Sequence, residues 1–386
     1  MFARIVASLA GLPFRSLPAL VHAPLLVISL SACDPFAAPD SMLDEYVKRV
    51  GRVLEVELRL SPVPIAPELP RRRDRLRPIP ELNVRMLDFL GLYGCELQHV
   101  IGERNSSLGR VMHPGSRLEY ELRFIRAADD CIAELARESL IERMEEVVTF
   151  KRATLSDVAW NAVWGGREVE HLFTRSRGRL AIGVDRNALA EMASELRAME
   201  TAVRRITAGE LEVDVKGLDS VYREWLRQPL MGQLIASAIL VTTRLDDAAT
   251  MIEMRLGSAP LCQKRMRNRR ADIMLSMFRS VYAEHVQPYL ADVQRARRDL
   301  LPPLQALAEI PGGGTEPVFH AYLQLVIADG SEGGWWAAFD NAVQRHTRAW
   351  QDLLDQCGML PGRAAAPAAP RAAGHPEIGQ SRPRTG

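Results

Sequence analysis

The side chains best suited to chemistry lie in one polar run, Glu103-Arg104-Asn105-Ser106-Ser107, which Arg110 follows closely. Donors from Arg104, Asn105, Ser106, Ser107 and Arg110 could form a recognition surface or a small anion site near a helix end. A serine here could also act as a nucleophile, but the sequence places no histidine beside it. The alternative is a structural turn, because Asn and Ser bind nearby backbone groups. We favour the structural turn and keep the run as a candidate binding surface.

Two further polar pairs could serve a metal ion or a substrate. His99 and Glu103 lie one helical turn apart, and so do Glu168 and His171. An exposed structural pair is the preferred interpretation of each. The sequence contains no G-x-S-x-G, no H-E-x-x-H, no P-loop and no G-x-G-x-x-G before a helix. We therefore expect no metal and no cofactor, and we lean towards a protein that is not an enzyme.

Residues 1–32 have the features of a lipoprotein signal peptide. Arg4 and Arg15 flank the start of a charge-free stretch that ends in Leu30-Ser31-Ala32-Cys33. This ending predicts a lipobox, in which Cys33 carries acyl chains such as palmitate and becomes the first mature residue. The alternative is an ordinary cleaved signal followed by a chance cysteine. More than one acyl chain on Cys33 would suffice for stable membrane anchoring.

The residues after the signal predict a tethered periplasmic protein. Asp34 looks like an inner-membrane retention signal, so the inner membrane is favoured over the outer membrane. Residues 33–40 would form the tether. Residues 230–243 are the most apolar run, but ~14 residues are fewer than a spanning helix needs, so we expect a buried core helix. Removing Arg4 and Arg15 takes the formal net charge from +1 to about −1, which argues against nucleic-acid binding.

Four cysteines remain beyond Cys33, and an even set in an oxidising compartment predicts two disulfides. Of the three pairings, we favour Cys95 with Cys131 and Cys262 with Cys357, because each pair flanks a plausible helical turn. Cys95 and Cys131 would lie opposite each other along the hairpin axis only if the helix before the turn continues through residues 106–112. Buried free thiols are the alternative. No C-x-x-C occurs, so zinc and thioredoxin-like sites lack their spacing.

Apolar periodicity predicts a mainly α fold, an antiparallel helical bundle in one or two lobes, over residues 41–360. A capping box at Ser116 marks the second helix of a hairpin over residues 87–126. Residues 179–184 and 211–215 could instead form a small patch of short strands. Residues 361–386 lack periodicity and should be disordered. The expected helical regions cover residues 41–58, 87–104, 116–165, 185–207, 218–310 and 335–356, and a further helix is opened by residues 315–317. We expect a break near residues 154–157 in the third region, and breaks near residues 257–260 and at residues 302–303 in the fifth.

Two surface features have competing interpretations. The basic run at residues 71–77 could lie on anionic headgroups, at about 1 kcal/mol per basic residue near the surface. The preferred alternative is a solvated loop that pairs with local acids. Trp335 and Trp336 are adjacent on a helix and so point in different directions; we expect one in the core and one at its boundary.

The runs ERNSSLGRVM, LYGC and LEYELRF resemble an uncharacterised family of bacterial lipoproteins, domain of unknown function 3080. The resemblance covers the chain from Cys33 to about Cys357. It implies a location in the cell envelope and no particular activity.

Three functions are therefore weighed. The first is a non-catalytic envelope lipoprotein that binds a periplasmic or membrane protein. The second is a hydrolase or transferase acting on cell-wall or lipid material, with Glu103 and Glu119 in its cleft. The third is small-ligand binding between helices. A concave pocket with converging ionisable groups would favour the enzyme, and a flat apolar patch would favour the binding protein.

Overall fold

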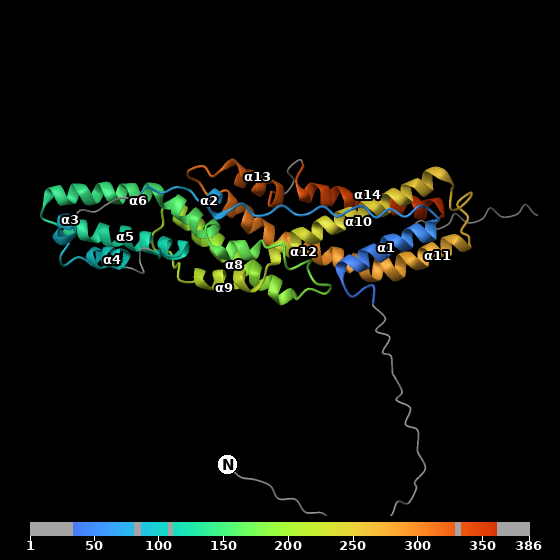
Figure 1. The fold of residues 1–386 in the computed structure, drawn as a ribbon, viewed down its shortest axis with the longest axis horizontal. Coiled ribbons are helices and arrows are strands. Elements are labelled where there is room, and N and C mark those ends of the chain that lie inside the picture. Colours follow the sequence, from blue (N-terminus) through green and yellow to red (C-terminus); the bar gives the residue numbers. More distant parts are fainter. Residues whose placement is uncertain (1–33, 81–85, 107–110, 329–332, 361–386) are drawn as a thin grey trace, which may run out of the picture. The chain divides into compact units, whose positions relative to one another are not determined.

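A computed structural model describes residues 34–80, 86–106, 111–328 and 333–360 (Figure 1). The chain divides into two units after Asp34, and the described residues from Pro35 onward belong to the second unit. Within the described ranges the second unit consists of helices and irregular segments, without a strand. The predicted mainly α fold is confirmed, and the alternative strand patch is not.

The helices follow one another along the chain with short connections. Their bounds are α1 Pro39–Leu54, α2 Arg72–Arg75, α3 Met86–Gly91, α4 Glu96–Asn105, α5 Pro114–Glu134, α6 Glu138–Trp164, α7 Arg167–Leu172, α8 Arg186–Thr207, α9 Leu218–Arg227, α10 Leu230–Ser258, α11 Arg269–Met277, the π-helix η2 Phe278–Val286, α12 Gln287–Ala308, α13 Pro317–Val326 and α14 Trp335–Gln356.

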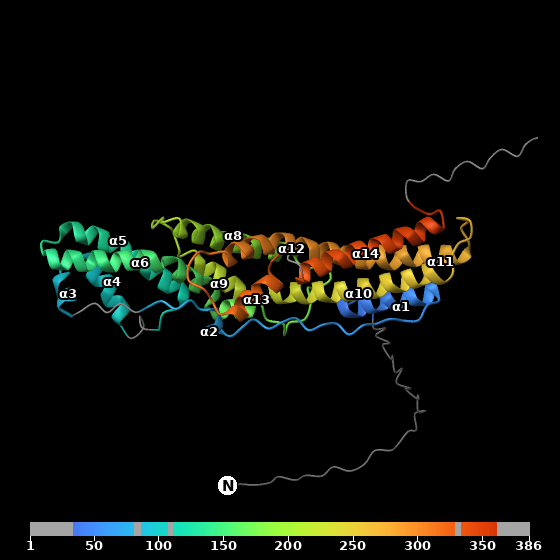
Figure 2. The same cartoon turned by 90° about the horizontal axis from the view of Figure 1, so that it is seen from above.

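Helix α10 is the central element of one half of the second unit. It packs against α14 and α1, and the three lie side by side in both views (Figures 1 and 2). Its first half is almost wholly buried, as the apolar run at residues 230–243 predicted. Gly232 permits a close approach here, since a Cβ at this position would lie 1.9 Å from the carbonyl oxygen of Thr174. A larger residue would therefore push α10 away from that loop.

The other half is built on the α5–α6 hairpin, with α4 packed against α5. The predicted single helix from residue 87 is interrupted: α3 ends at Gly91, and Gly94 adopts a φ of 94°, which favours glycine. Helix α4 then begins directly after Cys95. The hairpin of two packed helices is present, but its first helix is shorter than the periodicity predicted.

The segments predicted as alternative strands bind separate helices instead of each other. The backbone N–H of Leu180 donates to Ser237 Oγ on α10 at 2.9 Å, and its carbonyl accepts from the Tyr289 hydroxyl at 3.3 Å. Val213 and Val215 are buried in an irregular segment that precedes α9. Alternating apolar residues were therefore a sign of one-sided burial, which an extended loop also produces.

Two of the predicted helix breaks are absent. Helix α6 runs through residues 154–157, because the Thr154 hydroxyl donates to the carbonyls of Phe150 and Lys151 within the helix. Helix α12 contains Pro302 and Pro303. Leucines on both sides of the prolines are buried, so packing outweighs the cost of proline in a helix interior. The break predicted near residues 257–260 is present, since α10 ends at Ser258.

Two predicted helix starts lie elsewhere. Helix α1 begins at Pro39 with Ala38 as N-cap, before the predicted start at residue 41, and it ends at Leu54 rather than at residue 58. Helix α5 begins at Pro114, before the capping box at Ser116. Its cap is His113, whose Nδ1 accepts from the Gly115 N–H at 3.1 Å. Proline at the first position fits both helices, because it has no N–H to satisfy.

The last helix matches its prediction. Helix α14 covers residues 335–356, Trp336 is buried and Trp335 lies at the edge of the core. Helix α13 opens with Pro317, also as predicted. The π-helix η2 was not foreseen from the sequence, because its apolar spacing over nine residues resembles that of an α-helix.

Candidate functional site

The predicted polar turn follows helix α4. Ser106 is the C-cap residue, and its hydroxyl donates to the carbonyl of Glu103 at 2.7 Å. Asn105 is exposed, and Arg104 is half-buried. Ser107 and Arg110 lie outside the described residues. The geometry of Ser106 agrees with the structural interpretation, in which serine binds nearby backbone rather than acting as a nucleophile.

A buried charge cluster lies next to this turn. The Glu121 side chain on α5 is only 3% exposed and forms ion pairs with Arg117 and Lys151. Lys151 comes from α6, and its ammonium lies 4.3 Å from the centroid of the Phe124 ring and 5.2 Å from that of Tyr120. Two cations therefore share one buried carboxylate, a combination that sequence spacing alone did not reveal.

The electrostatics connect this cluster with Arg104. Burial lowers the pKa of Lys151, and Glu121 opposes that change. Burial also raises the pKa of Tyr120 to about 12. The positive charge of Arg104 acts on both groups, lowering each pKa. Arg104, Arg117, Glu121 and Lys151 are here called the α4–α6 charge cluster. Arg104 and Arg117 are partly exposed in it, so they can donate hydrogen bonds to an acidic group of a partner.

A groove of about 630 Å³ lies between α5 and residues 212–216, on the face of α5 opposite Glu121. Two of its lining arginines are paired: Arg126 binds Glu212 at 2.9 Å, and Arg123 donates two hydrogen bonds to Glu103, of 2.8 and 3.3 Å. The hydrogen bond that Arg123 donates to Glu103 raises the pKa of Arg123, and Glu119 adds to that change. The two predicted acids, Glu103 and Glu119, therefore both lie near Arg123.

The carboxylates that line this groove are Glu119, Glu212 and Asp214. No serine, cysteine or histidine is among the described residues that line it. Glu103 accepts both of its hydrogen bonds from Arg123, whereas a general acid needs a proton to donate. The arrangement can bind a charged peptide or carboxylate by exchanging ion pairs.

The predicted histidine pairs are separated. His171 Nδ1 lies 2.8 Å from the carbonyl of Trp225, whereas Glu168 Oε2 lies 3.0 Å from His113 Nε2. His113 Nδ1 accepts from Gly115, so Nε2 carries the proton and donates to Glu168. Burial is the largest single influence and opposes the charge of Glu168. The hydrogen bonds from His113 and from the Glu168 backbone, together with the charges of His113 and Arg167, nevertheless lower the pKa of Glu168. His99 is exposed, and Glu103 binds Arg123 rather than His99.

No group of three or more metal-ligating side chains occurs in the part of the chain that the structure describes.

The basic run at residues 71–77 is the largest correction to the sequence analysis. Arg75 and Arg77 are neither at a membrane surface nor solvated: their side chains are 1% and 8% exposed. Arg75 donates to the carbonyls of Trp164 and Gly166, and Arg72 donates to that of Gly165. These carbonyls end helix α6 and have no partner within it, so cations bind them favourably.

Arg77 performs the same role at a second helix end. It donates to the carbonyls of Ile310 and Pro311, both at 2.9 Å, just after α12. Its guanidinium also lies 3.9 Å from the centroid of the Trp160 ring, and Asp157 pairs with it at 3.4 Å. Burial lowers the pKa of Arg77, and Asp157 opposes that change. Sequence analysis missed this role because the helix ends lie far away in the chain.

Both predicted cysteine pairs are disulfides in the structure. Cys95 and Cys131 lie with their Cα atoms 5.5 Å apart, and Cys262 and Cys357 lie 5.1 Å apart. The first bond forms although α4 ends at Asn105, so it does not need the longer helix that the spacing argument required. Cys95 is the N-cap of α4 and has an extended backbone conformation. Its position along the hairpin is therefore not fixed by the helical rise of about 1.5 Å per residue.

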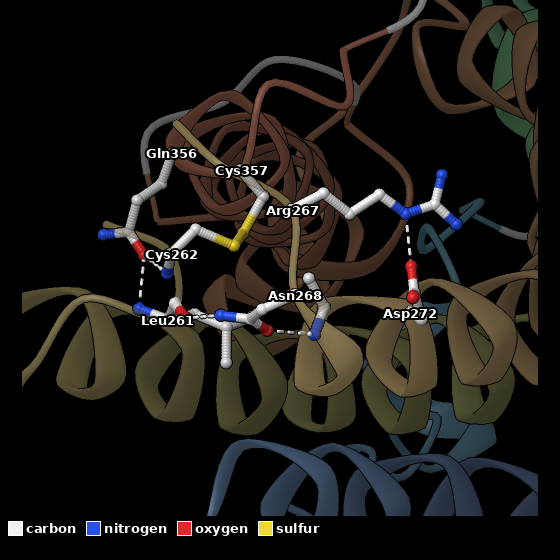
Figure 3. The surroundings of a disulfide bond; sticks show 8 residues. Leu261, Cys262, Arg267, Asn268, Asp272, Gln356 and Cys357 are labelled. Carbon is white, nitrogen blue, oxygen red and sulfur yellow. Dashed lines mark hydrogen bonds and ion pairs between the residues drawn. A yellow bond between two sulfur atoms is a disulfide. The ribbon is translucent and has the colours of Figure 1, made fainter. Parts of the chain in front are cut away.

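The second disulfide joins the end of α14 to the loop between α10 and α11 (Figure 3). Gln356, next to Cys357, accepts from the Leu261 N–H at 2.6 Å. Asn268 donates to the carbonyl of Leu261 at 2.8 Å and caps α11 through the Ala271 N–H. The loop is therefore held from both sides, and the disulfide lies within a network of hydrogen bonds.

The residues predicted for membrane attachment are mostly not described. Cys33 and residues 1–32 lie outside the described residues, as do residues 361–386. Asp34 is described and exposed. Among the described helices, none has the length and hydropathy that crossing a bilayer requires.

Comparison with known proteins gives one match. A family model described as protein of unknown function (DUF3080) matches residues 43–361. No curated protein matches the chain, and no solved structure does.

Proposed function

The chain belongs to the family described as protein of unknown function (DUF3080), and we propose that it is a lipoprotein anchored through Cys33 on the periplasmic side of the cell envelope. The observation that carries the proposal is a lipobox, Leu30-Ser31-Ala32-Cys33, followed by a domain with two disulfides. Disulfides persist in the periplasm and are rare in the cytosol, so they support export independently of the signal sequence.

The inner membrane is the proposed location. Asp34, directly after the lipidated residue, supports retention there. Density-gradient separation of the two membranes should place the wild-type protein with the inner membrane. Asp34→Ser should move it to the outer-membrane fraction, and an unchanged distribution would contradict the proposed sorting signal.

The proposed activity is non-catalytic binding of another envelope protein. The α4–α6 charge cluster supports this part, because Arg104 and Arg117 are partly exposed there and can donate hydrogen bonds to an acidic peptide. Arg104 and Arg117 would meet the acidic side chains, while the buried Glu121 holds Arg117 in place.

Crosslinking in intact cells, with mass spectrometry of the captured proteins, tests this activity. We expect a defined partner whose capture falls at least fivefold in Arg104→Ala/Arg117→Ala, with circular dichroism confirming the fold. Arg143→Ala is the matched control, since Arg143 is an exposed arginine on α6 that pairs with Glu146 of the same helix. Equal capture by both variants would exclude the charge cluster as the binding surface.

A further inference from the structure

A polar hollow of about 410 Å³ lies away from the charge cluster. It is formed between helices α10 and α14 and the strap, defined as residues 56–71, which runs along the helices as an extended segment (Figures 1 and 2). Its volume falls in the range of about 300–1,000 Å³ that is typical of small-molecule sites. The strap contributes Arg59 and Ser61, α10 contributes Thr242 and Asp246, and α14 contributes Trp335 and Arg345.

The polar wall of this hollow is fixed by its own contacts. Arg345 donates to Asp246 at 3.2 Å and to the Thr250 hydroxyl at 2.9 Å, and it also binds Glu253. On the strap side, the buried Asp247 accepts from the backbone N–H and the hydroxyl of Ser61, at 2.9 and 2.6 Å. Polar groups held in this way do not have to be ordered when a ligand binds, which favours affinity.

One donor in the hollow has no partner. The indole N–H of Trp335 is buried from solvent and makes no hydrogen bond. A buried donor without an acceptor costs about 1–3 kcal/mol. The other tryptophans in the described chain are at most 3% exposed, whereas Trp335 lies at the core boundary and lines the hollow. The ring of Trp335, rather than its N–H, is therefore the part that a bound molecule can contact.

The charges of the wall restrict the ligand. Arg59 and Arg345 are balanced by Asp246 and Asp247, so the hollow has no excess of either sign. A hydroxyl group can donate a hydrogen bond to a carboxylate and can accept one from a guanidinium group. A ligand rich in hydroxyls can therefore bind both kinds of charged side chain in this wall. Trp335, Pro62 and Pro64 supply apolar surface for C–H groups.

We propose that this hollow binds a neutral saccharide, with one sugar ring against Trp335 and its hydroxyls on Asp246, Arg345 and the threonines of α10. The proposal concerns residues of the second unit alone, so it holds whether or not the lipid anchor and the protein partner are confirmed.

Isothermal titration calorimetry of the detergent-solubilised full chain tests the proposal with cellobiose and N,N′-diacetylchitobiose as probes. We expect saturable binding of at least one of these neutral disaccharides, and weaker binding of the anionic glucose 6-phosphate. Binding should be accompanied by a change in tryptophan fluorescence that Trp335→Phe abolishes. By calorimetry, Trp335→Phe should weaken binding severalfold, because the smaller ring gives the sugar less apolar surface.

Two further variants test the hollow without changing Trp335: one fills the hollow, and the other is a control outside it. Thr242→Phe should abolish binding because the larger ring occupies the hollow. Thr347→Val, at an exposed position of α14 outside the hollow, should bind as the wild type does. The proposal is overturned if neither disaccharide binds, if glucose 6-phosphate binds more tightly, or if folded Thr242→Phe binds as well as the wild type.

Discussion

His346 is fully buried beside Tyr46 and Trp350, and its contacts show which form of the ring is present. Trp350 donates its indole N–H to the Tyr46 oxygen at 2.8 Å, so the Tyr46 hydroxyl is free to donate to His346 Nε2 at 2.6 Å. Nε2 therefore accepts, and the proton of the neutral ring is on Nδ1. Burial lowers the pKa of His346 to about 3.

This neutral histidine predicts an acid-sensitive stability. Below about pH 6.5 the unfolded chain binds a proton at His346, whereas the folded protein binds it only near pH 3. The contribution of the neutral His346 to the free energy of unfolding is therefore fully present above about pH 6.5. It falls by roughly 1.4 kcal/mol per pH unit as the pH drops towards about 3. Urea unfolding at pH 7.5 and 5.0 should show a smaller pH effect in His346→Gln. The exposed His320→Gln variant should keep the wild-type pH effect.

Arg77 gives a second prediction at the residue scale. Removing its side chain leaves Asp157 and the carbonyls of Ile310 and Pro311 without their partner. We expect Arg77→Ala to lower the free energy of unfolding by about 3 kcal/mol, since breaking a buried ion pair costs about 3–5 kcal/mol. Arg73→Ala, at a side chain that is 76% exposed, should change stability by no more than about 0.5 kcal/mol. Similar values for the two variants in urea titrations would refute the capping role of Arg77.

The two arginines also show where sequence reasoning stops at this scale. A run of five arginines is equally compatible with solvent, lipid headgroups and buried carbonyl groups. The choice depends on the ends of α6 and α12, which reach Arg75 and Arg77 only in the folded chain. By contrast, Ser106 and the tryptophan pair were predictable, because their roles depend on neighbouring residues.

At the scale of elements, helices with strong apolar periodicity were predictable and their ends were less so. The bounds of α14 agree with the prediction, and α10 is buried where its sequence is most apolar. Helix α12 continues through Pro302 because tertiary packing outweighs local preference. Helix α5 starts early because a histidine caps it, which the usual Ser, Thr, Asp and Asn preferences do not include.

The charge cluster and the polar hollow were not predictable element by element. Each combines side chains from separate helices: α5 with α6 in the cluster, and the strap with α10 and α14 in the hollow. Within α5 alone, Glu121 has the spacing of an ordinary surface pair with Arg117. In the folded protein Glu121 is buried because α6 packs against α5 and brings Lys151 next to it.

The disulfides give a prediction at this scale. Cys262 and Cys357 are 95 residues apart, and Cys95 and Cys131 are 36 residues apart. The larger loop loses more entropy when it is closed, so its removal should cost more, up to about 4–5 kcal/mol. In urea titrations Cys262→Ser/Cys357→Ser should therefore unfold at a lower urea concentration than Cys95→Ser/Cys131→Ser. The reverse order would show that strain or local contacts, rather than loop entropy, determine these contributions.

At the scale of the whole molecule, the proposed lipid anchor at Cys33 precedes a helical domain of the DUF3080 family. The family match begins at residue 43, soon after Cys33, so the proposed tether between them is short. A short tether would keep the domain close to the membrane surface, where envelope partners are accessible.

The most direct test of this account is metabolic labelling with an alkyne analogue of palmitate, followed by immunoprecipitation and membrane fractionation. We predict that the wild-type protein carries the label and is found in the membrane fraction. Cys33→Ala should lose both properties, while Cys95 and Cys131 remain oxidised if the chain is still exported. A Cys33→Ala protein that keeps the label or stays in the membrane fraction would contradict anchoring through Cys33.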